Sequence, residues 1–545
     1  MSAAAAAGRR RGWCPGALRP MATGDGLLVR LRLTAGHLPV ATARLIADLA
    51  ARHGNGLIDL SSRANLQLRG VTEASLGPLL DELAQAGLLD ETPAHETVRN
   101  VLASPLSDCD PTALCDALAA ARALEAALMG QGDGPLALPA KFSWIVDDGG
   151  ALPLDAIAAD VRFRAFIHDG ETLAEDEILW AIGLDAPEGT DWVGACPLSA
   201  MPDVARAIGL AFAEAMARDP GLRRMRQLDG AARRALLDGL KLEPLRGFPP
   251  HPSPLPTGER ENSGGCGGRR TMEVSPPLPG GERENSGGCG GRRAMEVSPP
   301  LAIGERENSS GCGGGRAMEA SPPLPGGERA GVRGPATVGV HRMASDRAVL
   351  TLALPFGRMA ARHLVLIAGM AETEGRGALR LGPWRQVHLP GIAAERAVAL
   401  MGRAAAAGFI TDAADARLAV IACPGAPACG SGEMPAQQDA ADMAAAAPEL
   451  AGAGLSLHVS GCVKGCAAQA TGRHPPGLTL VGRPGRYELV RGGATHARPI
   501  VALGAAEAAA GLARLAAHCR VRGGAAALAA LDDRELAGMF VASDG

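Results

Sequence analysis

The sequence predicts an α+β protein built from two related halves that an insertion separates. Residues 29–89 align with residues 350–410 without a gap, and the glycines at positions 36, 54, 56, 70 and 87 fall on glycines at 357, 375, 377, 391 and 408. Shared glycines indicate shared turns, and shared apolar positions indicate shared core faces. Each copy should therefore contain a strand, a helix, two strands joined by a tight turn, and a second helix, and the copies should pack as pseudo-symmetric halves.

A glycine- and proline-rich segment separates the two copies. The hexapeptide Gly-Glu-Arg-Glu-Asn-Ser begins at residue 258 and returns at residues 281 and 304. Residues 252–329 carry almost no large apolar side chains, so they cannot bury enough surface to order themselves or to stack as repeats. We interpret the segment as a disordered insertion and its repeated cysteines, Cys266, Cys289 and Cys312, as residues without a metal-binding role.

Length, charge and cysteine content exclude several classes of protein. The 545 residues are too many for one core, and the net charge of −4 gives no electrostatic basis for binding nucleic acid. Charged residues or glycine interrupt every apolar run, so no membrane span or secretory signal is predicted. The 12 cysteines are too few for a disulfide scaffold. We therefore expect a cytoplasmic protein that binds neither membranes nor nucleic acid.

Four cysteines in the second half form two pairs with unlike spacing. Five residues separate Cys423 from Cys429, and three separate Cys462 from Cys466. A 4Fe–4S cluster takes four thiolates at varied spacing, whereas structural zinc sites usually show two tight knuckles. The spacing therefore favours a cluster over zinc, and an electron-transfer centre favours a redox enzyme.

The segments that follow the two copies also resemble each other. Residues 101–105 are similar to residues 420–424, so Ser104 stands where the second half has Cys423. Residues 194–196 are similar to residues 460–462 in the same way. The first half keeps one cysteine of the four, Cys196, and we expect no cluster of its own there.

Lysine is rare in this chain, which makes its positions informative. It occurs only at Lys141, Lys241 and Lys464, while arginine supplies the other basic side chains. A compact ammonium and a planar guanidinium are not interchangeable at a binding site. Lys464 lies inside the second cysteine pair, and Lys141 lies in a further motif, so we infer functional roles for both.

Several motifs resemble those of the sulfite and nitrite reductase superfamily. The four cysteines match the C-x5-C and C-x3-C ligands of its 4Fe–4S cluster. Residues 62–67 resemble its T-R-Q-x-x-Q strand, residues 99–101 its R-N-V segment, and residues 138–142 its L-P-x-K-F segment. The resemblance implies duplicated ferredoxin-like half-domains and two sulfite-reductase-like α/β domains in a pseudo-two-fold arrangement.

This resemblance divides the chain into six segments. We expect an N-terminal segment at 1–23, ferredoxin-like half-domains at 24–92 and 341–411, α/β domains at 93–245 and 412–545, and the disordered insertion at 246–340. The second α/β domain should hold the cluster.

Within the superfamily, the chain resembles the branch of the precorrin-3B synthases. Residues 14–16 and 20–27 are similar to the N-terminal signature of that branch, and Ser143 stands where sulfite reductases commonly have a second lysine for the oxyanion. The resemblance implies an oxygen-dependent monooxygenase of aerobic cobalamin biosynthesis. It would hydroxylate precorrin-3A at C20 with O2 and form a lactone, with NADH or a separate reductase as the electron source.

A tetrapyrrole with many carboxylates needs several cations around a flat apolar slot. Side chains on a strand alternate between two faces, so the polar residues of 63–69 should share one face. A solvated strand face is the alternative interpretation. With the other motif positions, the predicted substrate contacts are Arg63, Asn65, Gln67, Arg69, Arg99, Lys141, Arg385 and Lys464.

The motifs do not identify the residues that would hold a metal ion for oxygen activation. The resemblance implies a mononuclear non-haem iron, but no 2-His-1-carboxylate pattern can be recognised, so its ligands are left unassigned. His388 and His458 lie near the motifs, but a single histidine is more often an ordinary hydrogen-bonding residue. In the reductases a cluster cysteine bridges to the sirohaem iron, and Cys466 has that position. A sirohaem-dependent sulfite or nitrite reductase and a non-catalytic iron–sulfur protein that binds tetrapyrroles remain the alternatives.

Overall fold

A computed structural model describes most of the chain outside the insertion. The described residues are 14–130, 132–168, 177–248, 338–343, 346–467, 477–493 and 495–541. They belong to one compact unit, Met1–Pro249 with Arg329–Gly545. The predicted disordered insertion lies outside the described residues over 249–337, as do its three repeated cysteines.

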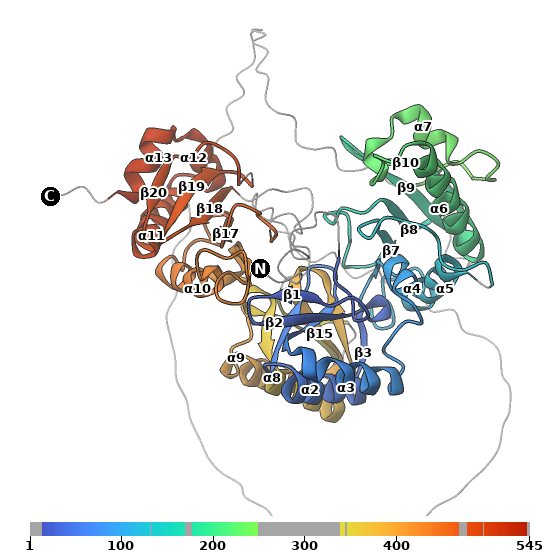
Figure 1. Cartoon of the computed structure of the whole chain (residues 1–545), viewed down its shortest axis with the longest axis horizontal. Helices are drawn as coiled ribbons and strands as arrows, with labels where there is room; N and C mark the ends of the chain where they lie inside the picture. Colours follow the sequence, from blue (N-terminus) through green and yellow to red (C-terminus); the bar gives the residue numbers. More distant parts are fainter. Residues whose placement is uncertain are drawn as a thin grey trace, which may run out of the picture. The chain divides into compact units, whose positions relative to one another are not determined.

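Four five-stranded sheets organise the described residues (Figure 1). The first sheet belongs mainly to the first copy, and all its neighbouring strands are antiparallel. In spatial order its strands are β1 (Met21–Thr23), β2 (Gly26–Leu31), β5 (Leu66–Val71), β4 (Leu57–Leu60) and β13 (Arg358–Ala360). Helices α2 (Val40–His53) and α3 (Glu73–Gln85) follow its strands in the chain.

A second sheet repeats this arrangement with the second copy. Its strands in spatial order are β11 (Gly339–Arg342), β12 (Arg347–Ala353), β15 (Gln386–Ala393), β14 (Ala378–Gly382) and β3 (His37–Pro39). Its helices are α8 (Ala361–Glu374) and α9 (Ala394–Ala406). Figure 1 shows α2, α3 and α8 on the same side of the strands, and one apolar core includes residues of both copies.

Each copy gives one short strand to the sheet of the other copy. The strand β3 of the first copy pairs with β14, and the strand β13 of the second copy pairs with β4. Equivalent turns precede the exchanged strands, and both contain a left-handed residue, Ala35 and Phe356, each with φ of 52°. This exchange confirms the pseudo-symmetric packing that the repeat predicted.

The other two sheets have one common topology. Three parallel strands are followed by two antiparallel strands in each of them. In the first half these are β6 (Val101–Ala103), β7 (Trp144–Asp147), β8 (Val161–Ile167), β9 (Ile178–Ala186) and β10 (Gly189–Pro197). In the second half they are β16 (Val420–Ala422), β17 (Leu457–Ser460), β18 (Leu478–Arg483), β19 (Arg486–Arg491) and β20 (Val501–Leu503).

Helices pack on these sheets and complete two α/β domains. The first has α4 (Pro93–Val98), α5 (Ala117–Met129), α6 (Met201–Arg218) and α7 (Gly230–Ala235). The second has α10 (Ala436–Ala446), α11 (Ala505–Val521), α12 (Ala525–Ala530) and α13 (Asp533–Phe540). Each domain has its own apolar core. Among the described helices, none combines the length and the apolar character that crossing a membrane requires.

The turn before β3 generates a stability prediction. Gly36 has φ of +66°, and a Cβ there would lie 2.1 Å from the carbonyl oxygen of Leu381 in the other copy. Gly36→Ala should lower the free energy of unfolding by about 2–4 kcal/mol, because backbone strain and steric overlap add. Urea denaturation measures the change.

The matched control for this substitution is Gly56→Ala. Gly56 has φ of +75°, but no atom lies within 4 Å of the place that a Cβ would take there. The control should lose only the strain contribution of about 1–2 kcal/mol. Equal losses in the two variants would show that the contact between the copies is not tight.

Candidate functional site

The four paired cysteines lie on two loops at one edge of the sheet of the second α/β domain. Cys423 directly follows β16, and Cys462 follows β17 after one glycine. The strands are parallel neighbours, so their carboxyl ends meet at the same edge. Burial raises the pKa of Cys423 and of Cys466, and the charges of the neighbouring thiols add to this effect. The fold thus brings the two pairs together.

The backbone around these thiols lies close to sulfur. The amide of Gly461 donates a hydrogen bond to Cys423 Sγ at 3.1 Å. A Cβ on Gly461 would lie 2.8 Å from Gly425 Cα and 3.5 Å from Cys423 Sγ, so a side chain does not fit there. Amide donors to sulfur and close backbone approach are features of iron–sulfur sites.

The cysteine thiols lie close enough to affect one another's ionisation. Within the described ranges, no three His, Cys, Asp or Glu side chains form a group that would hold a single metal ion. A zinc ion would need four ligands at about 2.0–2.3 Å. A 4Fe–4S cluster takes one thiolate at each of four irons, and four cysteines on two loops with an amide donor to Cys423 Sγ are a donor set of that kind.

Two of the three lysines lie near the second cysteine pair. Burial raises the pKa of Cys466, whereas the ammonium groups of Lys464 and Lys141 lower it. Both lysines are exposed, and Lys464 Nζ donates to Ser431 Oγ at 2.7 Å. The structure therefore brings a motif of the first α/β domain close to the cysteines of the second.

A row of polar residues crosses the face of the first sheet opposite its apolar core. Arg30, Gln67 and Asp59 are register partners on β2, β5 and β4, and Arg358 extends the row on β13. Arg32 lies two residues after Arg30 and continues the alternation. The sequence interpretation missed both arginines, although the run Arg-Leu-Arg after an apolar strand is a period-two signal that points to them.

Three arginines on this side of the sheet have unmet hydrogen-bonding capacity. Arg30 Nε, Arg32 Nε and Arg63 Nη2 are buried and have no hydrogen-bond partner in the part of the chain that the structure describes. Burial, together with a smaller contribution from the charge of Arg32, lowers the pKa of Arg30 and of Arg63 to about 10. The groups stay protonated at neutral pH. Buried cations of this kind are stabilised by anionic ligands.

The sequence predicted a strand with four polar residues on one face, and this prediction is wrong for residues 63–65. The strand β5 begins at Leu66, so Arg63 and Asn65 lie in the preceding turn. Ala64 between them is left-handed, with φ of 57°, which breaks the extended backbone. Arg63 donates from Nε to Asn100 Oδ1 at 3.1 Å and from Nη1 to the carbonyl of Ala158 at 3.2 Å.

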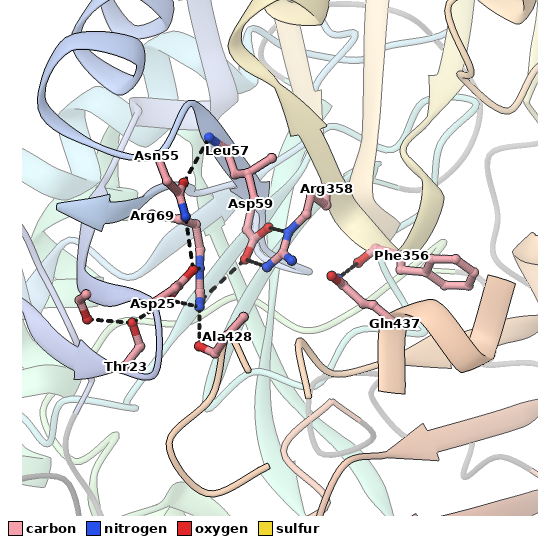
Figure 2. Close-up of polar contacts among 11 residues, drawn as sticks. Thr23, Asp25, Asn55, Leu57, Asp59, Arg69, Phe356, Arg358, Ala428 and Gln437 are labelled. Atoms are coloured by element: carbon pink, nitrogen blue, oxygen red, sulfur yellow. Dashed lines mark hydrogen bonds and ion pairs between the residues drawn. The ribbon is translucent and has the colours of Figure 1, made fainter. Parts of the chain in front are cut away.

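Two predicted substrate contacts are occupied by partners within the protein. Arg69 is 2% exposed and pairs with Asp25 at 2.6 Å, and its guanidinium also donates to the carbonyl of Ala428 (Figure 2). Arg99 pairs with Asp90 at 2.7 Å and with Glu125 at 3.1 Å. Most of the hydrogen bonds that these two guanidiniums can form are therefore made to groups within the protein.

Arg385 lies near the loop that begins at Cys423. It ends the short helix η6 (Pro383–Arg385) with φ of 63°, and it is the repeat equivalent of Ala64. Burial lowers the pKa of Arg385, and the negative charges of Asp59 and Cys423 oppose that shift. The side chain thus lies within electrostatic reach of both the first sheet and the cysteines.

The two histidines near the motifs are buried and neutral. Burial lowers the pKa of His388 to about 3 and that of His458 to about 4. His388 Nδ1 shares a hydrogen bond with Thr351 Oγ1 at 2.9 Å. Neither ring nitrogen of His458 has a hydrogen-bond partner among the described residues. Since these residues offer no triad, the ligands of an iron stay unassigned.

Comparison with known proteins agrees with this architecture. The family described as the nitrite/sulfite reductase ferredoxin-like half domain matches residues 19–86 and 341–407, one match in each copy. The chain is 28% identical to a precorrin-3B synthase from a Sinorhizobium species over 90% of its own length and 85% of that protein. Both copies of the repeat thus match the ferredoxin-like half domain of the nitrite and sulfite reductases.

Two other proteins are similar to this chain over a shorter stretch or in fold alone. A ferredoxin–nitrite reductase of Synechococcus elongatus is 31% identical over 28% of this chain and 30% of that protein. The solved structure of the Mycobacterium tuberculosis NirA protein has a TM-score of 0.62 at 16% identity, covering 94% of this chain and 84% of that one. The predicted fold class of duplicated ferredoxin-like halves with α/β domains is confirmed.

The lysines beside Cys466 generate a prediction about thiol reactivity. Lys464→Met should raise the pKa of Cys466, because a positive charge that stabilises the thiolate is lost. We expect a small shift, since both groups are exposed to solvent. The measurement is the pH dependence of Cys466 alkylation in cluster-free protein, followed by peptide mass spectrometry. Lys241→Met serves as the control, and an equal shift in both variants would contradict the local effect.

Proposed function

We propose that this chain is a precorrin-3B synthase, an oxidoreductase that converts precorrin-3A to precorrin-3B by C20 hydroxylation and lactone formation with O2. The similarity to the Sinorhizobium precorrin-3B synthase carries the proposal, because it extends over 90% of the chain. The similarity to the Synechococcus nitrite reductase covers 28% of it. A likeness through nearly the whole chain includes both halves and both α/β domains.

The environment of Ser143 supports this choice over an oxyanion reductase. Ser143 stands where sulfite reductases commonly have a second lysine for the oxyanion. Here it is 1% exposed, and its amide and hydroxyl both donate to Asp160 Oδ2, at 3.0 and 3.4 Å. A buried serine carries no positive charge, so this position does not provide the cation that a sulfite reductase commonly has there for its oxyanion.

Three guanidinium nitrogens without partners support a polycarboxylate substrate. Arg30, Arg32 and Arg63 bury guanidinium nitrogens that have no partner in the described chain. The acetate and propionate groups of a precorrin would supply the missing acceptors, and charge-assisted bonds of this kind orient a ligand as well as bind it. In the proposal these three residues hold the tetrapyrrole, while Gln67, Lys141, Arg385 and Lys464 line its surroundings.

The four cysteines are proposed to hold a 4Fe–4S cluster. Such a cluster supplies electrons one at a time when it is bound. The chain contributes the thiolates, the Gly461 amide at Cys423 Sγ, and the ammonium groups near Cys466. The amide and the ammonium groups offset negative charge at the cysteines and would therefore favour reduction of a bound cluster.

The remaining parts of the proposal come from the resemblance. They are a mononuclear non-haem iron with unassigned ligands, O2 as co-substrate, and NADH or a separate reductase as the electron source. A cytoplasmic location is included, because thiolate ligands persist in a reducing compartment.

Isotope labelling tests the reaction directly. The protein is reconstituted anaerobically with iron and sulfide and then given precorrin-3A, a reductant and isotopically labelled dioxygen. Mass spectrometry should find one labelled oxygen in the product, because the hydroxyl derives from O2. A product without label would refute the monooxygenase. Visible sirohaem bands with reduction of sulfite or nitrite would establish the reductase alternative.

The arginine contacts can be tested separately from folding. Arg32→Met should weaken precorrin-3A binding roughly tenfold to hundredfold, because a charge-assisted hydrogen bond contributes about 1.5–3 kcal/mol. The free energy of unfolding should fall by less than about 1 kcal/mol, since the change removes a poorly satisfied buried charge. Fluorescence titration and urea denaturation give the two values.

The control for this variant is Arg520→Met, which removes an exposed arginine that pairs with Glu449 at 2.8 Å. It should leave both quantities near those of the unaltered protein. A large loss of stability in Arg32→Met with unchanged binding would assign Arg32 to the fold instead.

A further inference from the structure

A buried guanidinium of the first sheet contacts the loop that carries Cys423 and Cys429. Arg69 Nη2 on β5 donates to the carbonyl oxygen of Ala428 at 2.6 Å (Figure 2). Ala428 directly precedes Cys429 in the chain. The amide of Gly24 donates to the same oxygen at 3.2 Å. One peptide carbonyl next to a proposed cluster ligand thus accepts two hydrogen bonds from the other end of the chain.

Arg69 is itself held in place by carboxylates. Its Nε and Nη2 donate to the two oxygens of Asp25 at 3.0 and 2.6 Å, and its Nη1 lies 3.6 Å from Asp59 Oδ2. Arg358 pairs with both oxygens of Asp59, at 2.6 and 2.9 Å. A bidentate pair fixes the plane of a guanidinium. Arg69 therefore presents its remaining N–H to the loop in one orientation.

The turn that contains Gly24 also limits the loop sterically. Gly24 lies between β1 and β2. A Cβ at this position would lie 2.0 Å from the carbonyl oxygen of Pro427 and 3.1 Å from the carbonyl carbon of Cys429. The turn and the loop are therefore in direct backbone contact, which only glycine permits.

The second sheet holds the equivalent loop of the first half. Arg380 is the repeat equivalent of Asp59, and it forms an ion pair with Asp108. Arg376 Nη1 adds a hydrogen bond to the carbonyl of Asp108 at 2.7 Å. Asp108 lies in the loop after β6, where Ser104 replaces the first cysteine. Each sheet thus contacts one such loop, and the loop that Arg69 contacts is the one with the proposed ligands.

We propose that Arg69 and Gly24 form a clamp on the Ala428–Cys429 peptide that positions Cys429 as a ligand and determines how firmly the chain retains its cluster. Arg69 acts here as a positioning residue, since it reaches the ligand through the peptide and touches no substrate. The inference rests on the proposed cluster. It also assigns a structural partner to an arginine that the sequence suggested as a substrate contact.

Two variants test the clamp from opposite sides. Arg69→Met removes the guanidinium, and Gly24→Ala pushes on the loop while it leaves Arg69 intact. After anaerobic reconstitution, both should release iron to a chelator roughly tenfold faster than the unaltered protein, because Arg69→Met loses a charge-assisted hydrogen bond to the loop and Gly24→Ala displaces the loop by steric overlap. Iron and sulfide content and the cluster's electron paramagnetic resonance spectrum after reduction are recorded alongside.

Arg358→Met is the matched control, because it removes an ion pair of the same network that does not touch the loop. It should release iron at a rate within about twofold of the unaltered protein. Equal release from Arg69→Met, Gly24→Ala and Arg358→Met would overturn the clamp. If Arg69→Met does not fold, Gly24→Ala decides: faster release supports the clamp, and unchanged release overturns it.

Alkylation of Cys429 separates the clamp from the cluster. In cluster-free protein, iodoacetamide should modify Cys429 several-fold faster in Arg69→Met and Gly24→Ala than in Arg358→Met, since the freed loop exposes the thiol. Equal rates would overturn the clamp. If the unaltered chain bound neither iron nor sulfide, the cluster proposal would fail, and this comparison would still test the clamp.

Discussion

The exchange of one short strand between the two copies is the constraint on which the rest of the structure depends. Because β3 completes the sheet of the second copy and β13 completes that of the first, neither sheet is closed by its own copy. The exchange joins the helices of both copies in one apolar core and leaves the opposite faces polar. Those polar faces are then held beside the loops that follow β6 and β16, where the distinctive chemistry of the chain lies.

The state of each arginine on the first sheet separates architecture from binding. Arg69 and Arg358 have carboxylate partners on the same sheet, so their charges are compensated within the protein. Arg30, Arg32 and Arg63 bury nitrogens that have no partner among the described residues. Since a buried N–H group without a hydrogen-bond partner lowers stability, binding of a polycarboxylate ligand would stabilise these residues. The same sheet can thus support the cysteine loop with one part of its polar face and bind a substrate with another.

Much of the fold was predictable because it depends on local patterns. The aligned glycines predicted the duplicated halves, and the similarity of residues 101–105 to 420–424 predicted equivalent loops in the two halves. Prediction of the site was less complete. The polar residues around Ala64 were assigned to a strand, and the left-handed backbone of Ala64 places Arg63 in a turn instead. Arg30 and Arg32 were missed because a period-two pattern identifies a face but does not say whether a charge on that face has a partner.

The sequence by itself determined the duplication, the two cysteine pairs and the serine at position 104 where the second half has Cys423, since each of these follows from residue type and spacing. Only the tertiary structure decided what each charged side chain does. Arg69 and Ala428 are far apart in the chain, and their hydrogen bond of 2.6 Å exists because the fold places a strand face against a loop. Periodicity specifies the direction of a side chain relative to its own element, but hydrogen bonds require a donor and an acceptor from different elements to meet within about 3 Å, which only the folded chain arranges.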